Sequence, residues 1–538
     1  MKRRDVLKGL TILPLGGAIP MVSSAANNIA GNDASGIPFA KGNIFESIGV
    51  DPLINCRGTF TIIGGSLERP AVRAAMEAAS TNFVQYDELA DGIGKRLAEL
   101  THAEWGMVSA GCAAGLKHVT AACVTGGNPE KLIRIPDLSG FDKTEVIIPR
   151  NARNAYDHAI RNIGVKIITV ENMEELTNAL SSRTAMIYLM SFNNQFKLED
   201  LAKLTRPKNI PILVDAAAED LTIPNIHLQA GADIVAYSGG KALCGPQCAG
   251  LLLGRKDLLM SAWQASSPHH GPGRDNKVGR EEMMGMLAAV ESWISLDHKV
   301  KWNKWLGYID TINKAVTKIT GVTTETVQPE GLDNKSPSLQ ISWDIEKLGV
   351  SGEEIAEELG RSKPRIALGA DGARGYETGE TSITVTTGQM QPGEDKIVAQ
   401  RITEVLTKQR PARSTQMKAP AANLSGRWDA DIRFFSSTAN HTLNIEQDGN
   451  WIQGSHKGDF TVREMVGTVD GDEVKLRSSD KIPGDNITFI FSGKISGDTI
   501  SGGVYMGEYR TATFTAKRYS YKNKRGPISV PGGPPLAT

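Results

Sequence analysis

The sequence predicts an α/β fold in two domains, followed by a small all-β domain. Three observations predict it. Between about residues 106 and 254, short and nearly continuous apolar runs alternate with amphipathic stretches. A shorter α/β pattern covers residues 339–406, and from residue 424 apolar and polar residues alternate between tight-turn signals. The first two patterns indicate sheets covered by helices, and the third indicates a barrel or sandwich. A chain of 538 residues is also too long for a single core.

Composition restricts the classes of function. Lys+Arg and Asp+Glu both number 60, so no global charge selects nucleic acid or an anionic membrane as a partner. We therefore expect a small molecule or a protein as the partner, and no nucleic acid. The five cysteines are odd in number and contain no Cys-x-x-Cys pair, which argues against a disulfide framework or a zinc site. The pair His269-His270 lacks the ligand spacing of a metal site, so no metal is expected.

The N-terminus has the pattern of an export signal. A charged segment, residues 2–8, precedes a mildly apolar run at 9–22 and small residues at 23–26. Arg3 and Arg4, followed by Val-Leu-Lys, resemble a twin-arginine signal. The apolar run is too short to be a stable membrane anchor. We expect export of the folded protein to the periplasm by the twin-arginine machinery; the alternative is a basic N-terminus with no targeting role.

The first α/β region is expected to contain a parallel or mostly parallel sheet. Strands are predicted at 146–148, 165–170, 186–190, 212–214 and 234–236, helices at 154–162 and 174–180, and a long helical region at 280–316. Ligands of such sheets bind at the carboxyl ends of the strands. The residues that directly follow each apolar run are therefore the candidates for a functional site.

The remaining elements complete the domain plan. A strand at 339–343, a helix at 352–359, a strand at 382–386 and a helix at 394–406 form the smaller α/β unit, and strands at 427–435, 441–447, 472–477, 487–493 and 511–517 form the β domain. The predicted divisions are a signal peptide at 1–26, an N-terminal arm at 27–70, a large domain at 71–320, a small α/β domain at 321–408, a linker at 409–423, the β domain at 424–521 and a disordered tail at 522–538.

Two neighbouring strand ends and one helix start carry the chemistry. Asp215 follows the run 212–214 and precedes small residues that include Ala217. Lys241 follows the run 234–236 after Ser238 and two glycines. Upstream, the small residues 109–115 are expected to open a helix near Gly111. A pyridoxal-phosphate site needs a lysine for the Schiff base, a carboxylate for the pyridine nitrogen and a helix N-terminus for the phosphate. A lone lysine or aspartate is usually structural, but this combination predicts that cofactor.

Five segments resemble one enzyme family. Residues 54–59, 109–115, 214–217, 238–247 and 277–282 are similar to the fold-type I pyridoxal-phosphate enzymes of the selenocysteine synthase-like group. That group includes L-seryl-tRNA selenium transferase and the D-glucosaminate-6-phosphate ammonia-lyase type. The resemblance implies a large domain with a mostly parallel sheet and a small α/β domain. It implies the following roles: Lys241 for the Schiff base, Asp215 for the pyridine nitrogen, and Gly111, Cys112, Ala113 and Ser238 for the phosphate.

The chain also departs from the transferase. That enzyme carries an additional N-terminal domain for tRNA, whereas only the signal and a short arm precede Ile54 here, and an exported protein would not meet aminoacyl-tRNA. Residues 154–158 resemble the lyase branch. We therefore expect α,β-elimination of the ammonia-lyase type, or β-replacement, on an amino acid or amino sugar acid. The alternatives are selenium transfer on seryl-tRNA, a racemase or aldolase with the same cofactor, and a binding protein without turnover.

Weaker candidates lie around these residues. Tyr156 and His158 are candidates for stacking on the cofactor ring or for acid catalysis, although helix packing explains them equally well. Four cations are candidates for gripping a substrate carboxylate or phosphate, and each also fits a solvated surface charge: Arg57, Arg153, Arg274 and Lys277. Enzymes of this group build their sites across a twofold axis, so a homodimer or larger homo-oligomer is expected.

Overall fold

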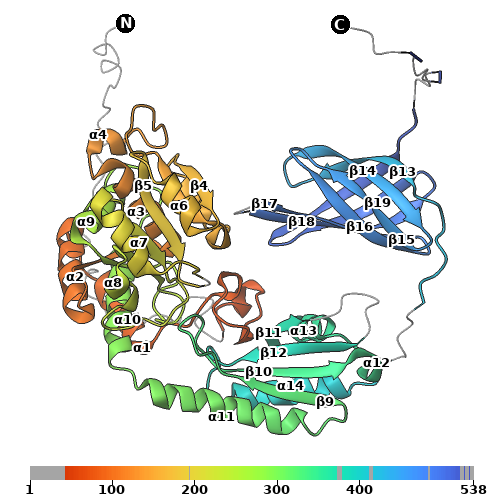
Figure 1. The fold of residues 1–538 in the computed structure, drawn as a ribbon. Coiled ribbons are helices and arrows are strands. Elements are labelled where there is room, and N and C mark those ends of the chain that lie inside the picture. The colour runs from red at the N-terminus through yellow and green to blue at the C-terminus, as the bar shows by residue number, and fades with distance from the viewer. Residues whose placement is uncertain are drawn as a thin grey trace, which may run out of the picture.

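The computed structural model describes residues 43–192, 194–371, 379–410, 416–482 and 485–521, together with 526–527 and 532–533. The predicted signal peptide lies outside the described residues, as do most of the arm before residue 43 and most of the tail. The described chain forms a large α/β domain, a small α/β domain and a β-barrel, each with its own hydrophobic core (Figure 1). Among the described helices, none combines the length and the apolar character needed to cross a membrane.

The large domain is built on a seven-stranded sheet of order β2-β8-β7-β6-β5-β3-β4. The strands are β2 (Trp105–Ser109), β8 (Gly250–Gly254), β7 (Ile234–Ser238), β6 (Ile212–Asp215), β5 (Thr184–Met190), β3 (Glu145–Pro149) and β4 (Lys166–Val170). All neighbours from β7 to β4 pair in parallel, and only β8 runs antiparallel to its neighbours β2 and β7. The predicted mostly parallel sheet is thus confirmed.

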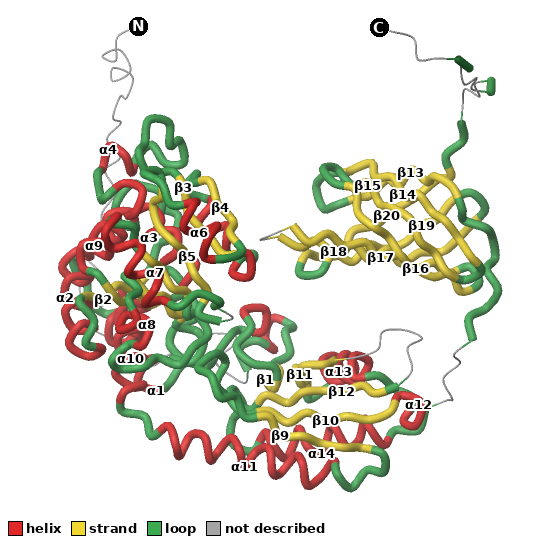
Figure 2. The backbone as a smooth tube through the Cα atoms, viewed as in Figure 1, coloured by secondary structure: helices red, strands yellow, loops and turns green. Residues whose placement is uncertain are grey.

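Helices cover both faces of this sheet (Figure 2). They are α1 (Pro70–Ser80), α2 (Tyr86–Thr101), α3 (Cys112–Thr125), α4 (Pro129–Leu132), α5 (Asp157–Arg161), α6 (Met173–Ala179), α7 (Leu198–Thr205), α8 (Ile226–Ala230), α9 (Lys256–Ala265) and α10 (Arg280–Ile294). Helix α3 is apolar or small on nearly every side and is buried from Ala114 to Ala122. Helix α5 begins later than predicted because the Asn154 side chain accepts a hydrogen bond from the Tyr156 N–H, which favours a turn there.

The small domain combines two distant parts of the chain, β1 and residues 298–407. Its sheet has the order β1-β11-β12-β10-β9, and β1 pairs in parallel with β11. The elements are β1 (Leu53–Cys56), α11 (His298–Val316), β9 (Val322–Val327), β10 (Ser338–Asp344), α12 (Ile345–Leu348), α13 (Gly352–Arg361), β11 (Arg365–Asp371), β12 (Glu380–Thr386) and α14 (Glu394–Thr407). The arm therefore contributes a strand to this domain.

The helical region predicted at 280–316 is two helices in two domains. It breaks at residues 295–297, where the Asp297 side chain caps α11 by accepting from the N–H groups of Lys299 and Val300. The apolar face of α11, including Ile312, packs in the small-domain core with Trp343. The domain division predicted at residue 320 thus falls after a helix that is already part of the small domain.

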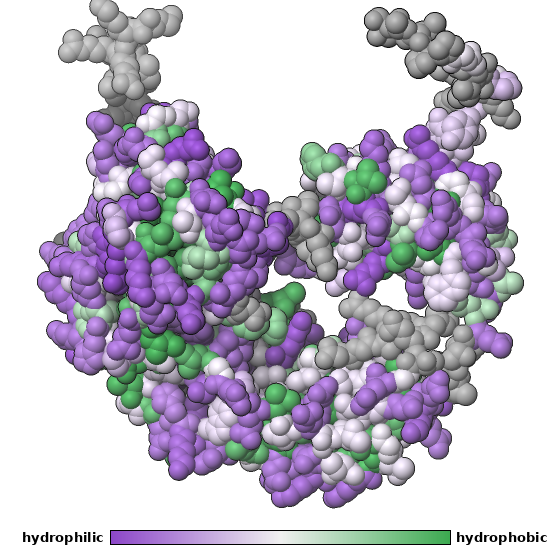
Figure 3. Space-filling view, in the orientation of Figure 1, coloured by the Kyte–Doolittle hydropathy of each residue, from purple (hydrophilic) through white to green (hydrophobic). Residues whose placement is uncertain are grey.

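The β domain is a closed eight-stranded antiparallel barrel. Its strands are β13 (Gly426–Arg433), β14 (Thr438–Asp448), β15 (Trp451–Lys457), β16 (Val462–Asp470), β17 (Glu473–Ile482), β18 (Asp485–Ser496), β19 (Thr499–Met506) and β20 (Tyr509–Arg518). Pairing of β13 with β20, from Trp428↔Arg518 to Arg433↔Thr513, closes the barrel and excludes the sandwich. The large domain and the barrel face each other with the small domain below them, and hydrophilic side chains dominate the visible surface of all three (Figure 3).

We expect Trp428 to be a main stabilising residue of the barrel. Its ring is 0 % exposed, its Nε1–H donates to the Leu424 carbonyl at 2.8 Å, and the Arg518 guanidinium lies 4.4 Å from the ring centroid. Trp428→Ala should lower the free energy of unfolding of the barrel by about 3–5 kcal/mol through loss of burial and packing. Calorimetry of the full chain measures this as a lowered barrel transition. Trp451→Ala is the control, because that ring is 62 % exposed on the same barrel and should change the transition little.

Candidate active site

The start of α3 is shaped by glycines. Gly111 precedes the helix with φ +88°, a left-handed conformation that favours glycine, and no side chain caps the helix. Gly250 on β8 lies against this turn, since a Cβ there would lie 2.5 Å from the Gly111 carbonyl carbon. The two glycines let the sheet support the helix start closely. The N–H groups of the first turn, which have no intrahelical acceptor, thus make an anion site.

Asp215 ends β6 as a buried carboxylate. It is 3 % exposed and accepts hydrogen bonds from Tyr188 Oη at 2.9 Å and from the Ala217 N–H at 3.0 Å. The Cys112 thiol at the start of α3 lies 3.7 Å from Oδ1. Burial raises the pKa of Asp215, and the hydrogen bonds and the charge of Lys241 oppose that rise. A cationic partner beside this carboxylate would compensate for its burial.

Lys241 follows β7, the strand that pairs in parallel with β6. The chain doubles back directly after it, with hydrogen bonds from Gly239 N to Ala249 O and from Gly245 N to Gly239 O, both at 2.8 Å. Gly240 has no space for a side chain, since a Cβ there would lie 2.6 Å from Gln247 Cα. The glycines before the lysine therefore permit this tight loop, as the sequence indicated.

These features surround one inner cavity of about 200 Å³. It is lined by Thr61, Gly111, Cys112, Ala113, Leu116, Tyr156, Met190, Ser191, Phe192, Asp215, Ala217, Ala218, Ser238, Lys241, Gln247 and Asp333. The structure thus brings together eight of the predicted residues, and the lysine, the carboxylate and the helix start all face the same space. Such a cavity can hold a flat ring that bears an anionic group.

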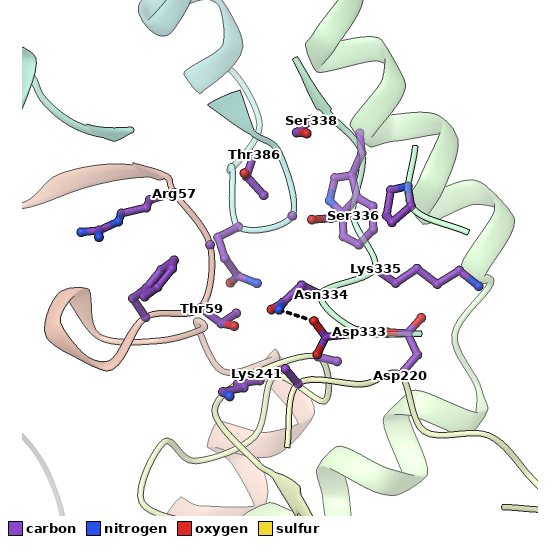
Figure 4. Close-up of a pocket in the computed structure, with 18 of the residues that line it drawn as sticks. Arg57, Thr59, Asp220, Lys241, Asp333, Asn334, Lys335, Ser336, Ser338 and Thr386 are labelled. Carbon is purple, nitrogen blue, oxygen red and sulfur yellow. Dashed lines mark hydrogen bonds between the residues drawn. The ribbon is translucent and has the colours of Figure 1, made fainter. Parts of the chain in front are cut away.

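An outer cavity of about 520 Å³ opens beside the inner one, between the large and small domains (Figure 4). Five residues line both cavities: Thr61, Tyr156, Ala218, Lys241 and Asp333. The outer lining carries the cations of Arg57, Lys301 and Lys335 and several hydroxyl and amide groups. In Figure 4, Arg57 and Lys335 point to opposite sides, whereas Lys241 and Asp333 lie near the middle. The outer cavity can therefore receive a polar substrate that reaches Lys241.

Four predicted residues lie outside both cavities. His158 is exposed on α5, and Lys277 is exposed as well. Arg153 forms an ion pair with Asp157 and donates to Thr169 Oγ1 at 2.6 Å, while the exposed Arg274 is 3.5 Å from Ser267 Oγ. Of the predicted cations, only Arg57 lines a cavity. The interior ion pair of Arg153 explains that residue structurally.

Several lining residues have no signal in the sequence pattern. Asp220 lies just beyond β6, and Asp333 and Lys335 lie between β9 and β10. These segments have no periodicity and no strand end in the parallel sheet. Only the packing of the small domain against the large one brings Asp333 and Lys335 to the site. A weak signal for Asp220 was its place shortly after Asp215, at the edge where ligands bind.

The known proteins to which this chain is similar include several enzymes. Residues 147–325 match the family model described as aminotransferase class-V. D-glucosaminate-6-phosphate ammonia lyase of Salmonella typhimurium is 26 % identical over 377 residues, covering 68 % of this chain and 98 % of that protein. A 5'-C-glycyluridine monooxygenase-decarboxylase of a Streptomyces species is 26 % identical over 378 residues, covering 67 % and 92 %.

Two further matches extend these comparisons. L-seryl-tRNA(Sec) selenium transferase of Moorella thermoacetica is 25 % identical over 285 residues, covering 46 % of this chain and 57 % of that protein. A solved structure of D-glucosaminate-6-phosphate ammonia-lyase matches with a TM-score of 0.59 and 25 % identity, covering 68 % of this chain and 98 % of that one. The curated relatives thus include a lyase, a monooxygenase-decarboxylase and a transferase on one architecture.

Proposed function

We propose that this protein is a pyridoxal-phosphate enzyme acting on amino substrates. Its α/β domains have the fold-type I architecture of pyridoxal-phosphate aminotransferases. One observation carries the proposal. Asp215 ends β6, Lys241 closely follows the neighbouring parallel strand β7, and both line one cavity with the uncapped start of α3. The residues fit the cofactor, because a buried carboxylate, an amine and an anion site line one cavity, and Ala217 and Ala218 add only small side chains to its wall.

Each residue has a role in holding the cofactor. Lys241 would bind the cofactor aldehyde, Asp215 would face the ring nitrogen, and the first turn of α3, with Ser238, would receive the phosphate. Ala217 would leave room for the ring face. When bound, pyridoxal phosphate supplies an electron sink for the pair released at the substrate Cα. Tyr188 and the Ala217 N–H fix the orientation of the Asp215 carboxylate.

The protein residues perform the proton chemistry. Lys241 stands where both cavities meet, so its Nζ can take the proton from Cα of a substrate that enters from the outer cavity. The outer cavity would bind and orient the rest of the substrate through Arg57 and neutral polar groups such as Thr59 and Ser336. The inner cavity lies deeper, where the buried surroundings of Asp215 limit the access of water.

We further propose α,β-elimination of the ammonia-lyase type on an amino acid or amino sugar acid, with β-replacement as the related reaction. The polar lining of the outer cavity suits a hydroxylated chain, and the ammonia-lyase relative aligns over 98 % of its length. Elimination of a β-hydroxyl group, tautomerisation and hydrolysis convert such a substrate into a 2-keto acid and ammonia.

Product analysis tests this function. The protein loaded with pyridoxal phosphate is incubated with D- and L-amino acids and amino sugar acids that carry a β-hydroxyl group, and ammonia and 2-keto acid are quantified. Equal yields of both products are expected from the wild type, and none from Lys241→Ala. Release of neither product would contradict elimination. Formation of the opposite enantiomer would indicate a racemase, and retro-aldol products would indicate an aldolase.

We propose that the enzyme is a homodimer or larger homo-oligomer. Large apolar side chains are exposed in the segments that precede and follow α1 in the sequence. Their exposed fractions are 49 % for Phe60, 77 % for Ile62, 64 % for Leu67 and 96 % for Phe83. Since Phe60 also lines the outer cavity, a second copy seated there would extend the cavity wall. Phe83→Glu should then shift the mass measured by light scattering toward the monomer. Phe435→Glu is the matched control, because Phe435 is 82 % exposed on the barrel; a monomeric wild type would contradict the proposal.

We also propose export to the periplasm through the twin-arginine pathway. The support is the sequence pattern of residues 1–26, which lie outside the described structure. A reporter fused to this segment should appear in the periplasm, and replacement of Arg3 and Arg4 by lysine should retain it in the cytoplasm. Export that is insensitive to this replacement would contradict the pathway.

A further inference from the structure

Asp333 stands where the small domain meets the cofactor cavity. It lies on the loop between β9 and β10, and it lines both the inner and the outer cavity. Asp215 lines only the inner cavity, and Asp220 lines only the outer one. Among the described carboxylates that line these two cavities, Asp333 is therefore the one that lies where the cavities join. Lys241 is the amine that lies at the same junction.

Backbone pairing fixes this residue against the large domain. Asp333 forms an isolated antiparallel bridge with Glu219. On either side of it, Asp220 N donates to Leu332 O at 3.0 Å and Asn334 N donates to Ala218 O at 2.9 Å. The segment that receives the loop begins three residues after Asp215, at the carboxyl end of β6. The loop thus places Asp333 at the ligand-binding edge of the parallel sheet.

One of the two oxygens of the Asp333 carboxyl group is held by a hydrogen bond. Asn334 Nδ2 donates to Asp333 Oδ2 at 2.9 Å, and within the described part of the chain no hydrogen bond to Oδ1 is found (Figure 4). Burial raises the pKa of Asp333 and the nearby Glu219 raises it further, while Asn334 and Lys241 lower it. Glu219 is itself engaged by His227 Nε2 at 2.6 Å. One oxygen of Asp333 is thus free to carry and deliver a proton.

We propose that Asp333 is the acid that protonates the oxygen leaving from Cβ of the substrate. The inference rests on the proposed elimination and adds a residue to it. Lys241 takes the Cα proton, the electron pair of that C–H bond forms the Cα=Cβ bond, and the Cβ–O bond breaks. The carboxyl proton of Asp333 moves to the departing oxygen, so that water leaves rather than hydroxide. The Asp333 carboxylate is then reprotonated from solvent.

The other groups of the site are less suited to this step. Asp215 is bound by Tyr188 and by the Ala217 N–H at the inner end of the cavity. Burial raises the pKa of Tyr156, and Asp215 raises it further, so this phenol is a weak acid. Asp220 does not reach the inner cavity, where the reacting bond would lie. Among the described residues, Asp333 alone combines a carboxyl oxygen that accepts no hydrogen bond with a place at the junction.

A pair of leaving groups tests the role. The β-hydroxy substrate found in the ammonia-release assay is compared with β-chloroalanine, whose chloride leaves without a proton. Asp333→Asn should lower kcat for the β-hydroxy substrate by about 10²–10⁴-fold and for β-chloroalanine by less than about 5-fold. Exchange of the Cα proton with deuterium, followed by NMR, should persist in this variant, because Lys241 is intact. Asp333→Glu should restore part of the kcat.

Asp220→Asn is the matched comparison, since Asp220 lines the outer cavity without reaching the junction. Its effect should fall mainly on KM and should be similar for both substrates. Equal slowing of both leaving groups by Asp333→Asn, or loss of Cα exchange in that variant, would overturn the acid role and indicate a structural one. A failure of the proposed function is recognised separately, because the wild type itself would then release no ammonia from any β-hydroxy compound.

Discussion

Lys241→Ala is expected to reduce the rate of ammonia release by at least about 10²–10⁴-fold, which is the range that loss of a general base produces. Loss of the covalent attachment of the cofactor should lower the rate further. The physical reason is the position of Lys241 at the junction of the two cavities, in the loop that follows the strand next to β6 and Asp215. The measurement is kcat for ammonia release at saturating cofactor. Lys241→Arg should be equally inactive, because a guanidinium remains protonated and cannot act as a base.

Lys335→Ala provides the control for this prediction. Lys335 also lines the outer cavity, but its side chain points away from Lys241 (Figure 4). Its replacement should change KM more than kcat, since it can contact only the distal part of a substrate. Full turnover by Lys241→Ala would contradict the assigned role, and so would an equal loss of kcat in both variants.

Asp215→Asn is expected to give the second large effect. The amide keeps the size of the side chain, and its one oxygen can still accept from the Ala217 N–H while its NH2 group donates to Tyr188 Oη, but it removes the charge opposite the ring nitrogen. Leaving one member of a buried ion pair without its partner costs about 3–5 kcal/mol. That energy corresponds to a loss of about 10²–10⁴-fold in kcat/KM.

The matched control for Asp215 is Tyr188→Phe. It removes one hydrogen bond to the carboxylate and leaves the charge, so it should cost about 1 kcal/mol, or roughly a factor of five to ten in rate. Steady-state kinetics with the same substrate measure both variants. If Asp215→Asn retained the wild-type rate, or lost no more activity than Tyr188→Phe, the charge would have no part in the reaction.

The inner cavity was predictable because its residues follow local rules. In a parallel sheet the carboxyl ends of neighbouring strands meet at one edge, so Asp215 after one apolar run and Lys241 after the next were bound to be close. The helix start at Gly111 was readable from its run of small residues. These features depend on where each strand ends and where the helix begins, and the local sequence indicates both.

The outer cavity was not predictable in the same way. Asp333 reaches it through a bridge to Glu219, more than a hundred residues earlier, and no periodic pattern marks either residue. Arg153 looked like a substrate-binding cation, but its side chain is engaged by Asp157 in the interior. Whether a charge faces a cavity or a partner is decided by tertiary packing, which a single sequence does not display.

The same contrast holds for the fold. Strands with continuous apolar runs, such as β3 and β6, were found, whereas β1 was missed because its partner β11 lies some 300 residues later. In the barrel, β15, β16 and β19 were missed, and all three contain glycines, which weaken the alternating pattern: Gly454, Gly467, Gly502 and Gly503. Closure of the barrel depends on β13 meeting β20, a contact between its two ends.

Reductive trapping tests the central claim most directly. The full-length protein is incubated with pyridoxal phosphate, reduced with borohydride and digested, and the modified lysine is located by mass spectrometry. The account predicts a phosphopyridoxyl group on Lys241, and no such group at that peptide in Lys241→Ala. Attachment at another lysine of the site, such as Lys301 or Lys335, or no stable attachment to the wild type, would contradict it.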